Sequence, residues 1–513
     1  MPTLLTPIPP ERGRRNASRL FFVGLLVVLL HLHCQLVLGG NTVRSVSQVM
    51  LPVSENCLAT NLGLSNDNQF LRGEKHPELY SSVLLPDKPL HQIARKRLPN
   101  IVIIMADDLG YGDISCYGST KIRTPNLDQM AREGVRFLDF HSNGAVCSPT
   151  RASLLTGKYQ QRTGVSGVIT AKEHRDVGLA LSEVTFAEVL KKEGYTTGIF
   201  GKWHLGYDPK YNPIHQGFDE FIGYVSGNVD YQSHVDQEGN ADWWKADELK
   251  NESGYTTDLI TRNAVDFIER AQERPFLLYI AHEAPHSPYQ NRSSKADRYA
   301  GAKNGIDFPA SGSEKDVSAM YKDMVEILDE GVGAAISTLK RLGLYENTMV
   351  LFFSDNGAVS RGSNGILRGF KSSVWEGGHR VPAIVQWPGQ IPSGWTSHET
   401  VLTMDVFPTL LDLAGCKVTQ RIDGTSIAEH LLYQKSLVPR TLFWQHGQQY
   451  AVRKGEWKLV VTRAGAKAEL YNVALDAEEK NDVAEEHPHL VKELQDAYKK
   501  WESEVHKGVK IIT

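Results

Sequence analysis

The sequence predicts an α/β sandwich whose large, mostly parallel central sheet is flanked by helices. Short continuous apolar runs recur along the chain, and each ends in a polar tip, which is typical of strands buried on both faces. Amphipathic helical patterns lie between these runs, and such alternation of strand and helix favours a parallel sheet. With 513 residues and 41% hydrophobic content, the chain can form one large core and a smaller accessory one.

The first 40 residues, 1–40, are expected to be a signal peptide. Arginines precede an apolar run from Leu20 to Leu38, and the small residues Gly39 and Gly40 that follow suit cleavage. An uncleaved membrane anchor is the alternative, because the run approaches the length of a spanning helix, although polar residues such as His31 interrupt it. The segment predicts entry into the secretory pathway, with a secreted, periplasmic or lysosomal destination set by the source cell. A membrane is expected as a partner only if the segment stays uncleaved.

Three further segments follow the signal. Residues 41–98 have weak periodicity and turn-rich pieces such as LPDKP, which predicts an N-terminal extension or linker. Residues 99–430 hold the alternating strand and helix patterns and are expected to form the catalytic domain. Residues 431–513 change to short alternating segments and end in an amphipathic helix from about 487 to 505. This last part predicts a C-terminal subdomain, a small antiparallel sheet with a terminal helix.

Five apolar runs predict strands of the central sheet: NIVIIMADD, YTTGIFGKWH, RPFLLYIAHEAPH, NTMVLFFSDNG and RVPAIVQWPG. The segments SEVTFAEVLKKEG and DMVEILDEGVGAAISTLKRLG between them predict helices. In parallel sheets ligands bind beyond the carboxyl ends of the strands. We therefore expect all five polar tips to point into a single site.

Two of these tips carry acidic and amide side chains. Asp107 and Asp108 end the first run, and Asp355 and Asn356 end a later one. Carboxylate and amide oxygens suit a hard cation such as calcium or magnesium rather than zinc. The structural alternative is that these residues only cap the turns that follow the strands.

Other tips supply cationic or titratable side chains, namely Arg151, Lys202, His204, His286 and Lys371. Together with a divalent cation, such groups are suited to holding a tetrahedral oxyanion and to stabilising charge during its transfer. Taken singly, the two lysines fit solvated surface charges equally well, and a histidine beside a proline fits a turn. The net charge of −4, from 56 basic and 60 acidic side chains, argues against nucleic acid as a partner.

Cys147 lies in CSPTR, just ahead of a helical pattern. A helix N-terminus lowers the pKa of a thiol, so this cysteine could act as a thiolate nucleophile. A cysteine buried in apolar surroundings would instead be inert. Both interpretations stay open at this point.

The segment CSPTR followed by ASLLTG resembles the C-x-P-x-R signature of the type I sulfatases, in which the cysteine is oxidised to formylglycine. GYTTGIFGKWH resembles the second signature of the family. PNIVIIMADDLGYGD, APHSPY, FSDNG and TMDVFPTLLDLAG are similar to family blocks and occur in the family's order. The resemblance extends from about Pro99 to the C-terminus and implies an alkaline-phosphatase-like sandwich. Phe200 is bulkier than the residue usual at that point, which puts the local packing in question.

The resemblance implies that one calcium ion is bound by the acidic and amide residues together with the modified cysteine: Asp107, Asp108, Asp355, Asn356 and Cys147. It also implies that a formylglycine-generating enzyme acts on the chain during maturation. In the mechanism of the family, one hydroxyl of the formylglycine hydrate attacks sulfur in line and the alcohol leaves. The second hydroxyl is then deprotonated, which expels sulfate and restores the aldehyde.

The roles implied for the cationic residues follow from their charge. Arg151 and Lys202 would stabilise the hydrate, and His204 is the candidate base for expelling sulfate. His286 and Lys371 would contact the substrate sulfate and assist the leaving oxygen.

The implied substrate is a sulfated carbohydrate or an aryl sulfate. SGNVDYQSH and SNGILRG are expected to border the pocket, and the tryptophans of ADWWK fit either a sugar-stacking surface or the core. Two alternatives to a sulfatase are considered. One is a phosphate or phosphonate ester hydrolase of the same superfamily, and the other is a catalytically dead paralogue that binds glycans.

Overall fold

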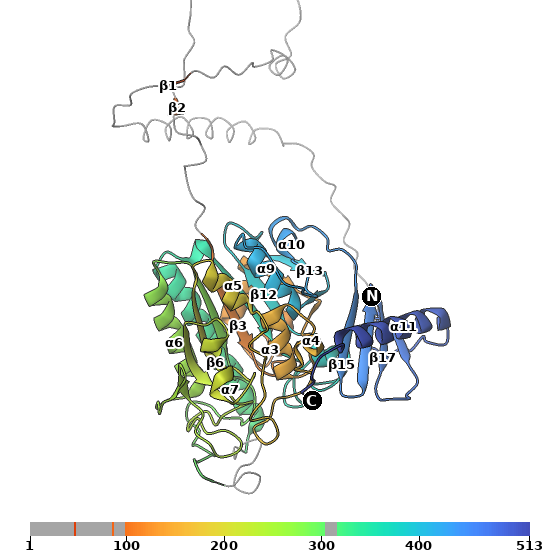
Figure 1. The fold of residues 1–513 in the computed structure, drawn as a ribbon, viewed down its shortest axis with the longest axis horizontal. Helices are drawn as coiled ribbons and strands as arrows, with labels where there is room; N and C mark the ends of the chain where they lie inside the picture. Colours follow the sequence, from red (N-terminus) through yellow and green to blue (C-terminus); the bar gives the residue numbers. More distant parts are fainter. Residues whose placement is uncertain (1–45, 48–84, 87–97, 303–314, 513) are drawn as a thin grey trace, which may run out of the picture. The chain divides into compact units, whose positions relative to one another are not determined.

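A computed structural model of the chain describes residues 46–47, 85–86, 98–302 and 315–512 (Figure 1). The chain divides into two compact units, Met1–Lys96 and Arg97–Thr513. In the first unit the described residues form strands β1 (Val46–Ser47) and β2 (Leu85–Pro86), which pair antiparallel. The predicted signal or anchor lies outside the described residues, as does most of the predicted extension. Among the described residues, no helix has the length and apolar character needed to span a membrane.

The described part of the second unit is built on a ten-stranded central sheet. Its strands, in spatial order, are β13 (Trp395–Ser397), β4 (Val135–Phe137), β12 (Ala383–Gln386), β11 (Thr348–Ser354), β3 (Asn100–Ala106), β10 (Phe276–Ala281), β6 (Thr196–Lys202), β7 (Glu220–Tyr224), β8 (Trp244–Lys245) and β9 (Glu248–Leu249). The run β11-β3-β10-β6-β7 is parallel throughout. The prediction of a large, mostly parallel sheet is confirmed.

One of the five predictions about the carboxyl ends of strands is wrong. β12, the strand of RVPAIVQWPG, runs antiparallel to β11, and its last residue Gln386 pairs with Val350 near the start of β11. Its polar tip therefore lies at the amino edge of the parallel strands, where Pro388 and Gly389 line a separate cavity of about 560 Å³. Only four of the five tips belong to the expected site, because a strand's apolar run carries no information on its direction.

The central strand β3 explains why the sheet is covered on both faces. All of its residues are buried, and its side chains alternate between two hydrophobic clusters. Ile101 and Ile103 belong to one cluster, whereas Val102 and Ile104 belong to the other. A strand that is apolar on both faces needs helices on both sides to exclude water.

Helices supply that cover, as Figure 1 shows for α3, α5 and α9 beside β3 and β12. The first cluster is completed by α3 (Cys147–Thr156), α5 (Phe186–Lys192) and α9 (Val406–Leu413). The second cluster is completed by α2 (Pro125–Glu133), α6 (Thr256–Ala271) and α7 (Val317–Arg341). Helices α5 and α7 are those predicted from SEVTFAEVLKKEG and from DMVEILDEGVGAAISTLKRLG. Phe200, whose size raised a question of packing, is fully buried in the second cluster against Phe267.

The shorter elements complete the described part of the unit. They are β5 (Phe140–His141), β14 (Val401–Leu402), α4 (Gln160–Thr163), α8 (Glu376–His379), α10 (Ala428–Tyr433) and the 3₁₀ turns η3 (Ser115–Tyr117), η4 (Pro209–Tyr211), η5 (Pro213–His215), η6 (Tyr345–Asn347) and η7 (Thr403–Asp405).

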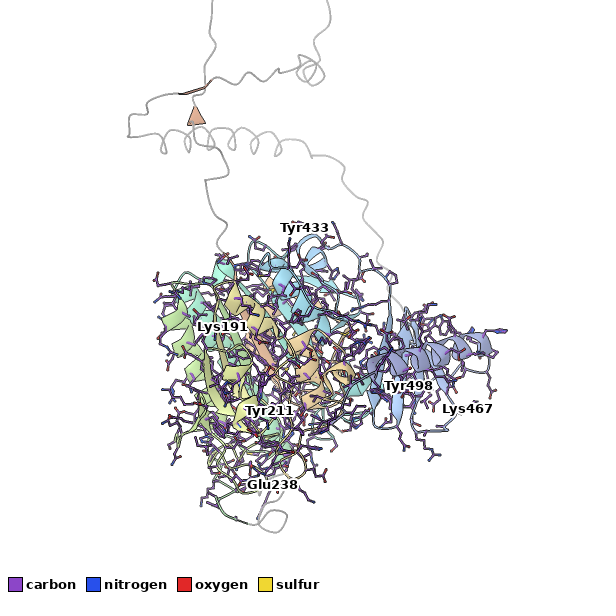
Figure 2. The ribbon with its side chains drawn as sticks, viewed as in Figure 1. Lys191, Tyr211, Glu238, Tyr433, Lys467 and Tyr498 are labelled. Carbon is purple, nitrogen blue, oxygen red and sulfur yellow. The ribbon has the colours of Figure 1, made fainter. Side chains whose placement is uncertain are left out.

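The C-terminal segments form the predicted antiparallel sheet with its terminal helix. The strands are β15 (Thr441–His446), β16 (Gln449–Lys454), β17 (Trp457–Val461) and β18 (Glu469–Asn472), and the helix is α11 (Pro488–Val505). Helix α11 lies across this sheet in Figure 1, and Figure 2 labels Tyr498 on it. Tyr498 stacks on Tyr450 at 3.7 Å between ring centroids, and Trp501 stacks on Phe443 at 4.9 Å. The division of the unit at residue 430 stays a prediction.

A buried ion cluster joins this small sheet to the loops around the central one. Lys458 of β17 lies 2.8 Å from Glu376 of α8 and 2.9 Å from Glu479, and all three side chains are fully buried. Its Nζ is also 3.2 Å from a ring nitrogen of His379. His141, Glu376 and His379 lie close enough together to hold a metal ion. However, the Lys458 ammonium already supplies a positive charge there.

We expect this cluster to make the stability of the protein depend on pH, because Glu479 shares the Lys458 ammonium with Glu376, which also pairs with Arg380 at 3.2 Å. Burial raises the pKa of Glu479 to about 7, and the Glu376 carboxylate adds to the increase while Lys458 opposes it. The folded state therefore holds this proton more tightly than the unfolded chain does. Ionisation of Glu479 destabilises the fold as pH rises from about 4.5 through 7.

We expect Glu479→Gln to remove this cost. Relative to wild type, the variant should gain about 1 kcal/mol of unfolding free energy between pH 6 and pH 8, measured by urea denaturation. Glu485→Gln, at an exposed carboxylate, serves as the control and should show a constant difference from wild type. A pH-independent difference for Glu479→Gln would show that this carboxyl does not titrate in the range.

Candidate active site

The acidic and amide residues come together at the carboxyl ends of two neighbouring parallel strands. β3 and β11 are paired so that Ala106 lies beside Ser354, and Asp107, Asp108, Asp355 and Asn356 follow at once. The backbone N–H of Asp108 donates to Asp355 Oδ1 at 3.2 Å, which ties the two strand ends together. Asp108 has φ of 64°, a left-handed conformation that is uncommon outside glycine and is held here by this pairing. These four residues are fully or almost fully buried.

Two buried cations compensate part of this negative charge. Lys202, the last residue of β6, forms an ion pair with Asp107 Oδ2. Arg151 of α3 reaches Asp107 Oδ2 at 3.3 Å and Asp355 Oδ2 at 3.0 Å through one Nη atom. Burial alone would raise the pKa of Asp107, but Lys202, His286 and Arg151 hold that pKa well below its ordinary value.

A glycine in β6 places Lys202 close to this acid cluster. Gly201 has φ of 109°, and a Cβ atom on it would lie 2.0 Å from the carbonyl oxygen of Ala281 in β10. Any side chain at this position would push β6 away from β10. Gly201 therefore allows the close approach of β6 to β10 that brings Lys202 next to the acid cluster.

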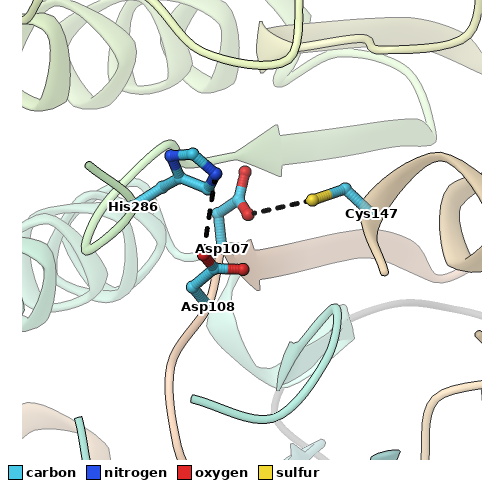
Figure 3. Close-up of side chains that lie close together, drawn as sticks. All are labelled: Asp107, Asp108, Cys147 and His286. Carbon is cyan, nitrogen blue, oxygen red and sulfur yellow. Dashed lines mark hydrogen bonds and ion pairs between the residues drawn. The ribbon is translucent and has the colours of Figure 1, made fainter. Parts of the chain in front are cut away.

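Cys147 is the first residue of α3 and points into the same cluster (Figure 3). Its Sγ lies 3.5 Å from Asp107 Oδ1 and 3.3 Å from Lys371 Nζ. Burial and the Asp107 carboxylate raise the pKa of the thiol to about 12. The unmodified thiol is therefore neutral at pH 7 despite its place at a helix N-terminus, which argues against a thiolate nucleophile.

Lys371 and His286 approach the cluster from the side of Asp108. Lys371 Nζ donates to Asp108 Oδ1 at 2.6 Å. His286 Nε2 lies 3.6 Å from Asp108 Oδ2, as the dashed line between these two residues in Figure 3 marks. The Nδ1 atom of His286 donates to the carbonyl oxygen of Ser287 at 2.7 Å, so Nε2 faces the site. Burial lowers the pKa of His286, and the nearby lysines add to this effect while Asp108 opposes it. Without bound substrate, this ring is therefore neutral at pH 7.

The neutral ring of His204 carries one unprotonated, buried nitrogen. Its Nε2 donates to the carbonyl oxygen of Ile169 at 2.9 Å, so its neutral ring carries no proton on Nδ1. Among the described residues, this buried Nδ1 has no hydrogen-bond partner. Burial, Lys202 and Arg151 hold the pKa of His204 well below its ordinary value. Thus His204 is a neutral acceptor, as a general base requires.

The site residues open into one cavity of about 150 Å³, lined by Cys147, His204, His286, Lys371 and segments 168–171, 226–228 and 236–238, with Tyr207. The predicted border SGNVDYQSH is represented by its first three residues. In contrast, residues 363–369 do not line this cavity. Segments 168–171 and 236–238 were missed because no strand-end pattern marks them.

The tryptophans of ADWWK lie away from this cavity. Trp243 is 2% exposed and stacks on His234, with ring centroids 4.6 Å apart. Trp244 lies in β8, next to the edge strand β9 of the central sheet, and donates to Asp242 at 2.7 Å. Of the two interpretations left open by the sequence, the structure therefore supports packing rather than a sugar-stacking surface.

The donor set fits a hard cation. Ligand atoms of Asp107, Asp108, Cys147 and His286 lie within 4.8 Å of one another. The Oδ1 atom of Asn356 is buried and has no hydrogen-bond partner among the described residues. Burial and the Asp107 charge raise the pKa of Asp355 to about 7, so Arg151 does not fully compensate the Asp355 carboxylate. A divalent ion bound by oxygen ligands would correct both features.

Comparisons with known proteins agree with this geometry. The family model described as Sulfatase matches residues 99–416, and the model described as N-sulphoglucosamine sulphohydrolase, C-terminal, matches residues 370–504. N-acetylgalactosamine-6-sulfatase of Rattus norvegicus is 37% identical over 389 residues, which cover 70% of this chain and 71% of that protein. Arylsulfatase A of Homo sapiens is 35% identical over 407 residues, covering 71% and 75%.

A solved structure shares the fold. The crystal structure of Ps i-CgsB in complex with k-i-k-neocarrahexaose has a TM-score of 0.73 at 30% identity and covers 81% of this chain and 96% of that one. The fold and the site thus define a hydrolase of the alkaline-phosphatase-like class. The chain belongs to the type I sulfatase family. It is a sulfatase, an enzyme that hydrolyses sulfate esters.

Proposed function

We propose that this sulfatase removes sulfate from a sulfated carbohydrate, using a formylglycine made from Cys147 and one calcium ion held by Asp107, Asp108, Asp355, Asn356 and the modified residue. The observation that carries the proposal is the place of Cys147. Its side chain lies between the Asp107 carboxylate and the Lys371 ammonium, at 3.5 Å and 3.3 Å, in a buried cluster of oxygen ligands. A formylglycine-generating enzyme would act on the chain during maturation in the secretory pathway.

The similarity to N-acetylgalactosamine-6-sulfatase supports a sulfated sugar as the substrate. The Ps i-CgsB structure, which is 30% identical, contains a neocarrahexaose and also favours a carbohydrate. The similarity to arylsulfatase A supports an aryl sulfate as a test compound. The small cavity, of about 150 Å³ and lined in part by charged and polar side chains, favours one sulfated ring over a long apolar ligand.

Calcium, when bound, would supply positive charge that polarises the sulfate oxygens. The chain's own residues would do the rest. Arg151 and Lys202 keep Asp107 ionised and place two positive charges beside residue 147. The formylglycine hydrate would supply the attacking oxygen, and His204 Nδ1, which lacks a partner among the described residues, would take a proton from the hydrate.

His286 and Lys371 are placed to act on the substrate. Both contact Asp108 and line the cavity, so a sulfate group in the cavity would meet the Lys371 ammonium and His286 Nε2. The negative charge of the sulfate would raise the pKa of His286, which then can protonate the leaving oxygen.

We expect His286→Gln to lower kcat by about 10²- to 10⁴-fold for a sugar sulfate, whose alkoxide is a poor leaving group. The loss should be smaller for an aryl sulfate, because a phenolate leaves without full protonation. Sulfate release measured by ion chromatography would test both the activity of the wild type and this difference.

His398→Gln changes an exposed histidine outside the cavity and is the matched control. Equal losses on both substrates for His286→Gln would argue for binding rather than proton transfer. A wild-type enzyme that hydrolysed phosphonate esters but no sugar sulfate would contradict the proposed substrate.

A further inference from the structure

Part of the cavity wall has no role in the proposed chemistry. It is formed by residues 226–228 and 236–238, beside the ring of His204, and a Cβ atom on Gly227 would lie 3.0 Å from that ring. The Lys371 ammonium and the neutral ring of His286 lie close to Cys147. The charged residues of the remaining wall are the acids Asp236 and Glu238. This wall is therefore acidic, whereas the part of the cavity beside Cys147 and Lys371, where the sulfate would bind, carries a positive charge.

Asn228 presents a hydrogen-bond donor to the cavity. Its side-chain Oδ1 accepts from Arg298 Nη1 at 2.6 Å, and a guanidinium can only donate, which fixes the orientation of the amide. The Nδ2 atom is therefore on the other side of the amide, and no group among the described residues accepts a hydrogen bond from it. Asn228 is 3% exposed and lines the cavity, so Nδ2 is available to a ligand there.

The surroundings of Asn228 hold this donor in place. Arg298 is 1% exposed, and its backbone N–H donates to Asp230 Oδ2 at 3.1 Å. The backbone N–H of Val229 donates to Glu283 Oε1 at 2.7 Å, and the Ser226 hydroxyl donates to the Asn228 carbonyl oxygen at 2.9 Å. These hydrogen bonds hold both the side chain and the backbone of Asn228, so its amide group loses little conformational entropy when a ligand binds.

Glu238 supplies the other polar group of this wall. Asp236 is committed to its own turn, since its Oδ1 accepts from the backbone N–H groups of Glu238 at 2.8 Å and Asn240 at 2.7 Å. Glu238 is half-buried and has no ion-pair partner among the described residues. Figure 2 labels it on the larger part of the unit, away from Tyr498 of the C-terminal helix.

We propose that Asn228 and Glu238 form the subsite that selects the sugar ring, and that it accepts a ring carrying one sulfate and otherwise uncharged substituents. Asn228 Nδ2 donates to an oxygen of a hydroxyl or acetamido group next to the sulfate ester. The Glu238 carboxylate accepts from a hydroxyl or amide N–H and repels a second sulfate or a carboxylate on the sugar. This inference rests on the proposed function and specifies its substrate.

Asn228→Asp tests the donor, because the new carboxylate keeps a partner for Arg298 while removing both N–H groups. We expect KM for a monosulfated N-acetylhexosamine to rise at least about 10-fold, with a smaller effect on an aryl sulfate. Asn481→Asp, at an exposed position in the C-terminal part, is the matched control and should keep wild-type constants. The melting temperature of each variant would show whether the fold is retained.

Glu238→Gln tests the repulsion. We expect wild type to prefer the monosulfated sugar over a disulfated one, and the variant to raise kcat/KM for the disulfated sugar about 5- to 10-fold. Glu248→Gln, at an exposed carboxylate outside the cavity, should change neither substrate. The rise should shrink at high salt, because screening weakens the repulsion.

The outcomes separate the two proposals. If wild type releases no sulfate from any sugar sulfate, the proposed function fails. If wild type does so but both variants retain its KM and its preference between the two sugars, only the subsite assignment is overturned. An equal loss of kcat on sugar and aryl sulfates for Asn228→Asp would also overturn the subsite assignment, because Asn228 would then act on the sulfate group rather than on the sugar ring.

Discussion

We expect Cys147→Ala to lower kcat/KM for every sulfate ester by at least about 10⁴-fold. The proposed mechanism depends on a nucleophile made from this side chain, and the methyl group of alanine has no atom that could replace it. Sulfate release from an aryl sulfate would measure the loss. Cys416→Ala removes a half-buried free thiol elsewhere and is the matched control.

Cys147→Ser gives a more specific result. The introduced hydroxyl can accept sulfate but has no second hydroxyl to expel it, so we expect one turnover at most. The tryptic peptide from Phe137 to Arg151 should then gain the mass of one SO₃ group after exposure to substrate. In wild type, the same peptide should carry an aldehyde that resists thiol alkylation. An alkylatable thiol in fully active enzyme would refute the formylglycine proposal.

Removal of the proposed calcium ion should also lower activity. We expect the chelator EGTA to lower activity at least about 100-fold and to lower the melting temperature, because, among the described residues, the three buried carboxylates then have only the side-chain charges of Lys202, Arg151 and Lys371 as partners. Saturation at 100 times the dissociation constant would stabilise the fold by about 2.7 kcal/mol. Calcium should restore both properties.

A variant can separate metal binding from other effects of the chelator. In Asp355→Asn we expect the melting temperature to respond little to calcium, since a ligand that carries charge is lost. Asp496→Asn, at an exposed carboxylate of α11, should respond as wild type does. A calcium response in Asp355→Asn equal to that of wild type would remove this residue from the ligand set.

The strand ends are where the sequence was most informative. An apolar run followed by acids, as in NIVIIMADD, is recognisable because a buried parallel strand must end where water or a ligand begins. The pairing of β3 with β11 then brings Asp107 and Asp355 together, as expected from the position of ligand sites in such sheets. The same rule failed for β12, because strand direction depends on which neighbour a strand pairs with.

The open interpretations of single residues needed the folded structure. A helix N-terminus favours a thiolate at Cys147, whereas burial beside Asp107 favours a neutral thiol, and only the folded structure shows that burial is the larger effect. The protonation of His204 likewise depends on Ile169, which lies 35 residues earlier in the chain. No local pattern encodes such a contact.

The sequence by itself determined the α/β architecture, the acids at the strand ends and the resemblance of CSPTR to a family signature, since each depends on residues adjacent in the chain. Only the tertiary structure decided which strand runs antiparallel, which nitrogen of His204 donates to Ile169, and that Asn228 and Glu238 border the cavity. The physical reason is that burial, charge compensation and hydrogen-bond partners are set by segments distant in sequence. The fold alone brings those segments together.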